Sequence, residues 1–150
     1  MWKTCLLELL VLGVCSAVCP MGFVQHGTSC YMPFHIKASW SEANYYCKMI
    51  QSSLLSIDDA SEEQFITGYI GRLGPAAFSS DSLWLGGTSL FSGSWIWTRT
   101  QTSPVYTAWA PNEPSTHPLN KCMAIGFKSQ FKWTANVCEQ LNNFICESPS

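Results

Sequence analysis

Cysteines carry most of the reactive chemistry in this 150-residue chain. Cys5 and Cys15 lie in an N-terminal segment where Lys3 precedes an apolar run and small residues follow at Ser16 and Ala17, the layout of a secretory signal peptide. Cleavage after Ala17 leaves an even number of cysteines, which predicts complete pairing into disulfides in an oxidising compartment. The remaining cysteines are Cys19, Cys30, Cys47, Cys122, Cys138 and Cys146.

Other groups that could perform chemistry are dispersed. His26, His35 and His117 are far apart in sequence, and the nucleophile elbow, the zinc-binding HExxH helix, the phosphate-binding loop and the CxxC pair are all missing. An acidic cluster from Asp58 to Glu63 could be read as paired catalytic carboxylates, but its place at the start of a predicted helix favours capping and stabilisation of the helix dipole. The sequence therefore predicts no catalytic residue and no enzyme activity.

Composition and length narrow the classes of partner. The net charge is −2 and only 12% of residues are charged, which disfavours a nucleic-acid partner bound by phosphate neutralisation. The N-terminal apolar run is shorter than the roughly 20 residues that span a bilayer, and no second such run follows. We therefore expect a secreted, soluble protein with a signal peptide at residues 1–17 and one domain at residues 18–150, without a membrane span.

Helical spacing of apolar residues predicts two helices in the first half of the domain. Ser39 is a plausible N-cap with Glu42 as its capping-box partner, and the helix that follows places Cys47 on a buried face. A second helix should follow the acidic cluster and end near Gly71 to Gly74. Before the first helix, a strand pair over residues 21–31 with a turn near residues 26–28 would bring Cys19 and Cys30 within bonding range.

The second half reads as short strands broken by glycine and serine. Strands are predicted at residues 54–57, 83–87, 94–98, 122–125, 131–133 and 143–146. Residues 99–120 show no periodicity and contain four prolines. A long irregular segment inside a compact domain is usually a functional loop, so we expect the binding site there.

Several motifs together resemble the long form of the C-type lectin-like domain, over essentially the whole of residues 18–150. They are Cys19-Pro20 with Cys30-Tyr31, Ser39-Trp40-Ser41-Glu42-Ala43, Trp84-Leu85-Gly86, Trp109-Ala110-Pro111-Asn112-Glu113-Pro114 and Asn143-Phe144-Ile145-Cys146-Glu147. The resemblance implies an α+β fold with two helices, two small antiparallel sheets and a long loop region. It also implies three disulfides, joining Cys19 to Cys30, Cys47 to Cys146, and Cys122 to Cys138. Residues 69–74 and the short spacing between residues 113 and 122 are similar to those of perlucin-like molluscan lectins.

Sugar-binding members of this family hold a calcium ion with loop oxygens that also grip sugar hydroxyls, and this chain keeps only part of that ligand set. Glu113-Pro114-Ser115 stands where the family has Glu-Pro-Asn or Gln-Pro-Asp, so a carboxylate remains and a hydroxyl replaces an amide or a carboxylate. Asn120 stands where a second acidic ligand is usual. Thr134 and Ala135 replace the Asn-Asp pair after Trp133. Each lost carboxylate weakens the attraction for a divalent cation.

The resemblance therefore predicts a degenerate site. The expected carbohydrate-binding residues are Glu113, Ser115, Asn120 and Thr134. Calcium, if held, would be held weakly by Glu113 and Asn120. Asn136, one residue past Ala135, could supply a further amide if the loop shifted.

The sequence leaves some alternatives open. A saccharide or surface glycan is the expected partner, in innate immune recognition or an extracellular matrix, and the rival is a calcium-independent scaffold that binds protein or mineral. The chain has no dense acidic run, which favours the glycan over the mineral. Lys121, Lys128 and Lys132 either supply positive charge near Glu113 or are ordinary solvated side chains. Homo-oligomerisation also stays open.

Overall fold

The structure is a computed structural model and describes residues 18–150, so the predicted signal peptide lies outside the described residues. The elements are β1 (Val24–His26), β2 (Ser29–Ala38), α1 (Trp40–Met49), β3 (Ser53–Leu54), α2 (Ala60–Leu73), the short 3-10 helix η1 (Pro75–Ala77), β4 (Ser82–Thr88), β5 (Ile96–Trp97), β6 (Asn120–Gly126), β7 (Trp133–Val137) and β8 (Asn142–Pro149). Within residues 18–150, no helix has the length and hydropathy needed to cross a membrane.

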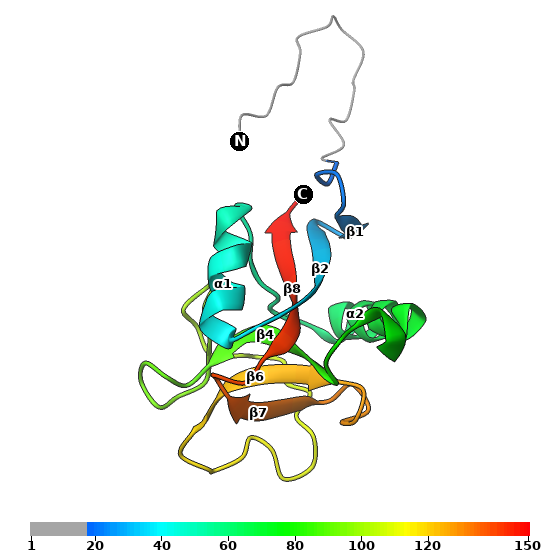
Figure 1. Ribbon diagram of the computed structural model, residues 1–150. Coiled ribbons are helices and arrows are strands. Elements are labelled where there is room, and N and C mark those ends of the chain that lie inside the picture. The colour runs from blue at the N-terminus through cyan, green and yellow to red at the C-terminus, as the bar shows by residue number, and fades with distance from the viewer. Residues whose placement is uncertain (1–17) are drawn as a thin grey trace, which may run out of the picture.

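The described strands form one mixed sheet in the order β1-β2-β8-β4-β6-β7, while β3 pairs with β8 and β5 pairs with β4. Every pairing is antiparallel except the contact between β4 and β8, which consists of the parallel pairs Leu83 with Asn143 and Trp84 with Phe144. These two pairs join the two small sheets that the family resemblance implies into one hydrogen-bonded network. In Figure 1, α1 lies along β8 near both ends of the described chain, and the long loop extends beyond β6 and β7 on the opposite side.

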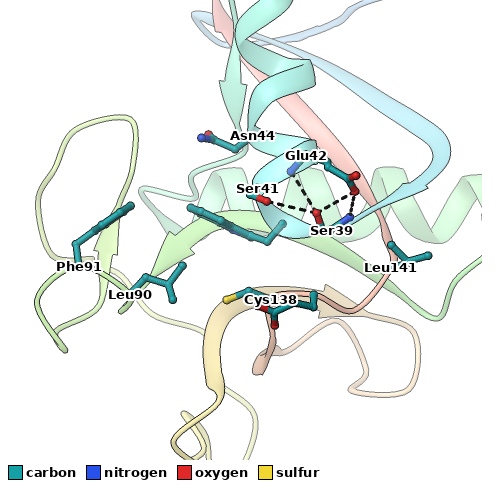
Figure 2. Close-up of a pocket in the computed structure, with 10 residues that line it drawn as sticks. Ser39, Ser41, Glu42, Asn44, Leu90, Phe91, Cys138 and Leu141 are labelled. Atoms are coloured by element: carbon teal, nitrogen blue, oxygen red, sulfur yellow. Dashed lines mark hydrogen bonds between the residues drawn. The ribbon is translucent and has the colours of Figure 1, made fainter.

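The first helix begins where the capping box predicts. The Ser39 hydroxyl accepts a hydrogen bond from the Glu42 backbone N–H, and the Glu42 carboxylate accepts one from the Ser39 backbone N–H at 2.8 Å (Figure 2). Trp40, Ala43 and Cys47 form the buried face. The Trp40 indole N–H donates to the carbonyl of Leu85 in β4 at 2.9 Å, which holds the helix against the sheet.

The second helix uses the acidic cluster as its cap, as predicted. The Asp59 carboxylate accepts from the Glu62 backbone N–H at 2.9 Å, and the Glu62 carboxylate accepts from the Asp58 backbone N–H at 2.8 Å. The helix ends at Leu73 because Gly74 adopts a φ of 74°, a left-handed conformation that glycine accepts without steric cost. Its buried face packs on the sheet.

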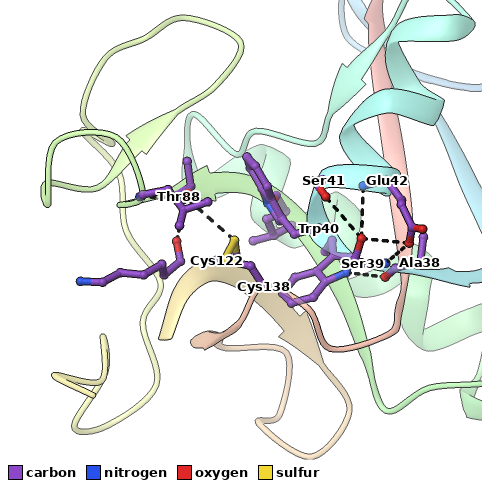
Figure 3. The surroundings of a disulfide bond; sticks show 12 residues. Ala38, Ser39, Trp40, Ser41, Glu42, Thr88, Cys122 and Cys138 are labelled. Atoms are coloured by element: carbon purple, nitrogen blue, oxygen red, sulfur yellow. Dashed lines mark hydrogen bonds between the residues drawn. A yellow bond between two sulfur atoms is a disulfide. The ribbon is translucent and has the colours of Figure 1, made fainter. Parts of the chain in front are cut away.

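The disulfides join the pairs that the resemblance implies. The Cα–Cα distances are 5.6 Å for Cys19–Cys30, 5.3 Å for Cys47–Cys146 and 5.2 Å for Cys122–Cys138. Cys47–Cys146 links α1 to β8 across 99 residues. Cys122–Cys138 lies beside the start of α1, where the Trp40 backbone N–H donates to the Cys138 carbonyl at 2.9 Å (Figure 3).

Two groups of buried side chains form the core. One group lies on the α1 side of the sheet and includes Ala38, Trp40, Ala43, Cys47, Leu54, Trp84, Ala124 and Phe144. The other includes Leu55, Ile57, Ile66, Ile70, Leu83, Leu85, Met123, Ile125, Trp133 and Ile145. Gly86 lets β4 pass close to β3, since a Cβ atom at this position would lie 2.8 Å from the carbonyl oxygen of Leu54.

Several strand limits differ from the prediction. The segment predicted as a strand at residues 131–133 is mostly a turn, and β7 runs over residues 133–137 instead. Gln130 and Phe131 have φ values of 53° and 59°, and the Phe131 N–H bonds back to the Gly126 carbonyl, so the chain reverses there. The predicted strands at 94–98 and 54–57 are reduced to β5 and β3. Apolar content alone did not reveal these turns.

Candidate functional site

The long loop comprises residues 98–119, between β5 and β6, and an ion-pair network fixes its start. The guanidinium of Arg99 donates to the Asp58 carboxylate at 2.6 Å, and its Nε lies 3.9 Å from a carboxylate oxygen of Glu147. Glu147 is only 4% exposed and also accepts hydrogen bonds from the Ser56 backbone N–H and the Ser29 hydroxyl. Burial raises the pKa of Glu147, and the positive charge of Arg99 opposes this rise.

The middle of the loop is attached to β7 through backbone hydrogen bonds. The Trp133 N–H donates to the Ala108 carbonyl at 2.8 Å, and the Ala110 N–H donates to the Trp133 carbonyl at 2.9 Å. The Trp133 ring is fully buried, with the rings of Trp97, Tyr106 and Trp109 edge-on against it at centroid distances of 5.4, 5.9 and 5.8 Å. The loop thus has an aromatic core of its own, which holds the segment around Glu113 in place.

A buried carboxylate from α2 lies beneath this aromatic core. The Trp133 indole N–H donates to Oε2 of Glu63 at 3.0 Å, whereas the other oxygen of this carboxylate is buried without a hydrogen-bond partner. Burial raises the pKa of Glu63, and the nearby charge of Lys132 partly opposes it. The sequence alone places Glu63 in the acidic cap cluster. Its spacing with Ile66 and Ile70, three and seven residues later, was the signal that it faces inward.

Glu113, the expected principal ligand, uses its carboxylate to close the loop on β7. One oxygen, Oε2, accepts hydrogen bonds from the backbone N–H of Ser115 at 2.6 Å and from the backbone N–H of Ala135 at 3.0 Å. The peptide bond between Glu113 and Pro114 is cis. The side chain is half-buried, so the carboxylate contributes to the loop structure as well as to the surface.

Ser115 and Asn120 lie at different places on the loop. The Ser115 hydroxyl accepts from the His117 backbone N–H at 3.2 Å and remains next to Glu113. Asn120 is the first residue of β6 and pairs with Val137 on β7. Thr134 is three residues before Val137, so Asn120 lies about 10 Å along the strand from it. Among the described residues, no hydrogen bond joins Asn120 to Glu113 or Thr134.

Thr134 and Asn136 share one face of β7. Successive strand residues point to opposite faces, and Trp133 and Ala135 are buried whereas Thr134 and Asn136 are half-exposed. The Asn136 amide donates to the Thr134 hydroxyl at 3.1 Å. Thr134 and Asn136 thus form a polar edge along β7, and Asn136 lies beside Thr134 without any shift of the loop. The structure brings Glu113 and Ser115 together with the backbone of Ala135, next to this pair.

The lysines divide by position. Lys128 is in the turn after β6, at the opposite end of that strand from Asn120, and forms an exposed ion pair with Asp81. The charge of Lys132 acts on Glu63, where it partly opposes the rise in the pKa of that carboxyl. Lys121 directly follows Asn120 in β6, and successive strand residues point to opposite faces of the sheet.

These residues do not fit the calcium ion that the family resemblance implies. Calcium takes six to eight oxygens and is usually held by several carboxylates. Here the one carboxylate, Glu113, already accepts two backbone N–H groups, and Ala135 offers no side-chain oxygen. Within residues 18–150, no group of three or more His, Cys, Asp or Glu side chains could hold a metal ion.

Comparison with known protein families decides the family of this chain. The sequence model of the family described as the lectin C-type domain matches residues 36–148. The chain belongs to the C-type lectin domain family. Perlucin from Haliotis laevigata is 36% identical over 132 residues, which cover 86% of this chain and 82% of perlucin. The galactose-specific lectin nattectin from Thalassophryne nattereri is 28% identical, covering 85% of this chain and 79% of nattectin.

Solved structures of the C-type lectin fold agree with the architecture. The crystal structure of a calcium-independent type II antifreeze protein has a TM-score of 0.75 at 25% identity and covers 88% of this chain and 95% of the antifreeze protein. The fold and family confirm the predicted resemblance, and they place the chain among binding proteins rather than enzymes.

Proposed function

We propose that this protein is a secreted lectin that recognises a saccharide or surface glycan at the edge of the long loop, and that it does so without a calcium bridge. Glu113, Ser115 and Thr134 form the centre of the site, with Asn136 beside Thr134, and Asn120 contacts an extended glycan further along the edge. The hydroxyl, amide and carboxylate groups of these side chains match the hydrogen-bonding capacity of sugar hydroxyls.

The observation that carries the proposal is the double hydrogen bond of Glu113. Its Oε2 accepts from Ser115 and Ala135, so this carboxylate holds the loop against β7 directly. In a calcium-bridged site, the ion would organise these loop segments. Here backbone hydrogen bonds supply that order, and within residues 18–150 the second oxygen of Glu113 accepts no hydrogen bond, so it can accept one from a sugar hydroxyl.

The relatives bear on the proposed function and on its rival. Nattectin is described as galactose-specific, which supports saccharide recognition. The antifreeze protein is described as calcium-independent, which shows that a domain of similar fold can exist without relying on the ion. The name perlucin states no ligand, so the rival that the sequence leaves open, a protein- or mineral-binding scaffold, is the second candidate.

A glycan array tests the proposal. The secreted protein is applied with calcium and again with a chelator, and the bound glycans are compared. We expect the same glycans to bind in both conditions. Loss of binding under chelation would refute the calcium-independent site, and silence across the array in both conditions would refute saccharide recognition in favour of the scaffold.

Point variants locate the site. Ser115→Ala and Thr134→Ala each remove one hydroxyl and should reduce binding several-fold, since a lost hydrogen bond costs about 0.5–1.5 kcal/mol. Ser61→Ala is the matched control, because it removes the same kind of hydroxyl from an exposed position on α2. Equal binding by all the variants would show that the glycan binds elsewhere.

A further inference from the structure

A groove lined in part by Cys138 is separate from the proposed saccharide site. It has a volume of about 620 Å³ and lies between the start of α1 and the segment after β4. Figure 2 shows Leu90 and Phe91 on one side, Leu141 on the other and Cys138 below. These three apolar side chains are 50%, 70% and 55% exposed. Exposed apolar residues gathered around a hollow mark an interaction surface more often than singly scattered ones do.

Most polar groups in the groove are already satisfied by one another. The Ser39 hydroxyl donates to the Glu42 carboxylate at 2.9 Å, and it also lies 3.4 Å from the Ser41 hydroxyl. The side chains of Asn44 and Glu139 make no hydrogen bond within the described part of the chain. A saccharide needs many free hydrogen-bonding groups, so this lining favours an apolar ligand with few polar anchors.

The charge of the groove has one sign. Among the described residues that line it, Glu42 and Glu139 are carboxylates and none is a cation. A partner that buries an apolar side chain here would gain further from a lysine or arginine beside it. A second copy docked groove to groove would instead bring four carboxylates together, which opposes self-association.

We propose that this groove binds a short segment of a partner protein in which a leucine or phenylalanine side chain is flanked by lysine or arginine. The apolar side chain packs between Phe91 and Leu141. The Asn44 amide offers both a donor and an acceptor to the backbone of the partner segment, and Glu139 pairs with the cation. This interaction is independent of the saccharide site.

A synthetic peptide, Arg-Leu-Arg-Phe-Arg, provides the probe, and fluorescence polarisation with ¹⁵N chemical-shift mapping measures its binding. The peptide should bind and shift resonances of Phe91, Asn44 and Leu141, whereas Glu-Leu-Glu-Phe-Glu and Arg-Ser-Arg-Ser-Arg should bind more weakly. Phe91→Ser should weaken binding roughly 10- to 100-fold, as expected for loss of one buried aromatic contact. Glu139→Gln should weaken it less and should reduce its salt dependence.

The control variant is Val105→Ser, which removes a fully exposed apolar side chain from the long loop. Equal effects of Val105→Ser and Phe91→Ser, equal binding of the acidic and basic peptides, or shifts outside the groove would overturn the proposal. It would also be overturned by a wild-type dimer that Phe91→Ser dissociates, which would identify a second copy as the occupant. Phe91→Ser should leave glycan-array binding unchanged, so failure here is distinguishable from failure of the saccharide site.

Discussion

Two regions of the molecule use a carboxylate in the same way, but over very different separations in sequence. The α1 side is formed by α1, β2 and β8. The loop side is formed by the long loop with β6 and β7. On the α1 side, Glu42 accepts from the backbone N–H of Ser39, three residues away. On the loop side, Glu113 accepts from the backbone N–H of Ala135, across 22 residues. Both carboxylates satisfy backbone groups that would otherwise lack partners.

The difference lies in what else holds each region. The α1 side has a fully buried disulfide and an apolar helix face packed on the sheet. The loop side has the Cys122–Cys138 disulfide, which closes only 16 residues, and the long loop itself is held by hydrogen bonds from single side chains and by one aromatic cluster around Trp133. Stability should therefore depend on covalent linkage and packing on the α1 side, and on individual polar groups on the loop side.

The largest effect is expected from the disulfide between α1 and β8. Replacing Cys47 and Cys146 together by alanine opens a loop of 99 residues, for which the chain-entropy model gives about 4–5 kcal/mol. The same double replacement of Cys19 and Cys30 opens 11 residues and should cost less, about 3 kcal/mol. Urea unfolding measures both. A greater loss for the Cys19–Cys30 variant would contradict the dependence of this stabilisation on the length of the closed loop.

A smaller loss is expected from Glu113→Ala. Two backbone N–H groups lose their acceptor, and an unsatisfied buried donor costs about 1–3 kcal/mol, reduced here because the site is half-exposed. Glu113→Gln keeps an acceptor oxygen and should recover most of the stability. The melting temperature should be independent of calcium in the wild type. Calcium stabilisation that disappears in Glu113→Ala would show that this carboxylate binds the ion instead.

The sequence predicted the α1 side better than the loop side, and the distances above explain why. Capping at Ser39 follows from a three-residue spacing, and the cysteine pattern implied its pairing through the family resemblance. The hydrogen bond from Ala135 to Glu113 depends on how two distant segments meet, so no local pattern encodes it. The inward-facing Glu63 and the turn at Gln130 and Phe131 were missed for related reasons, because an acidic cluster and an apolar run each fit more than one structure.

Loss of the first helix cap should cost about 1 kcal/mol. In Ser39→Ala, the N–H of Glu42 loses its side-chain acceptor, and substitution of an N-cap serine by alanine typically costs 0.5–2 kcal/mol. Asp59→Ala removes the corresponding cap of α2 and is the matched comparison. Chemical denaturation followed by circular dichroism measures both losses. No loss in Ser39→Ala would mean that packing of α1 makes its cap redundant.

The smallest effect should appear as a pH dependence beneath the loop. Burial raises the pKa of Glu63 above its ordinary value of 4.5, so the folded protein binds this proton more tightly than the unfolded chain does. Its stabilising contribution is therefore fully present below about pH 4.5 and is lost as the pH rises through the folded-state pKa.

Glu63→Gln keeps an oxygen acceptor for the Trp133 indole and removes the buried charge. Relative to the wild type, the variant should become progressively more stable between pH 4 and pH 7, as unfolding free energies in urea would show. Glu147 also has a raised pKa, but its contribution is common to both proteins and cancels in the difference. A constant difference across this range would mean that the Glu63 carboxylate is solvated as well in the folded protein as in the unfolded chain, and that the aromatic cluster around Trp133 does not exclude water from it.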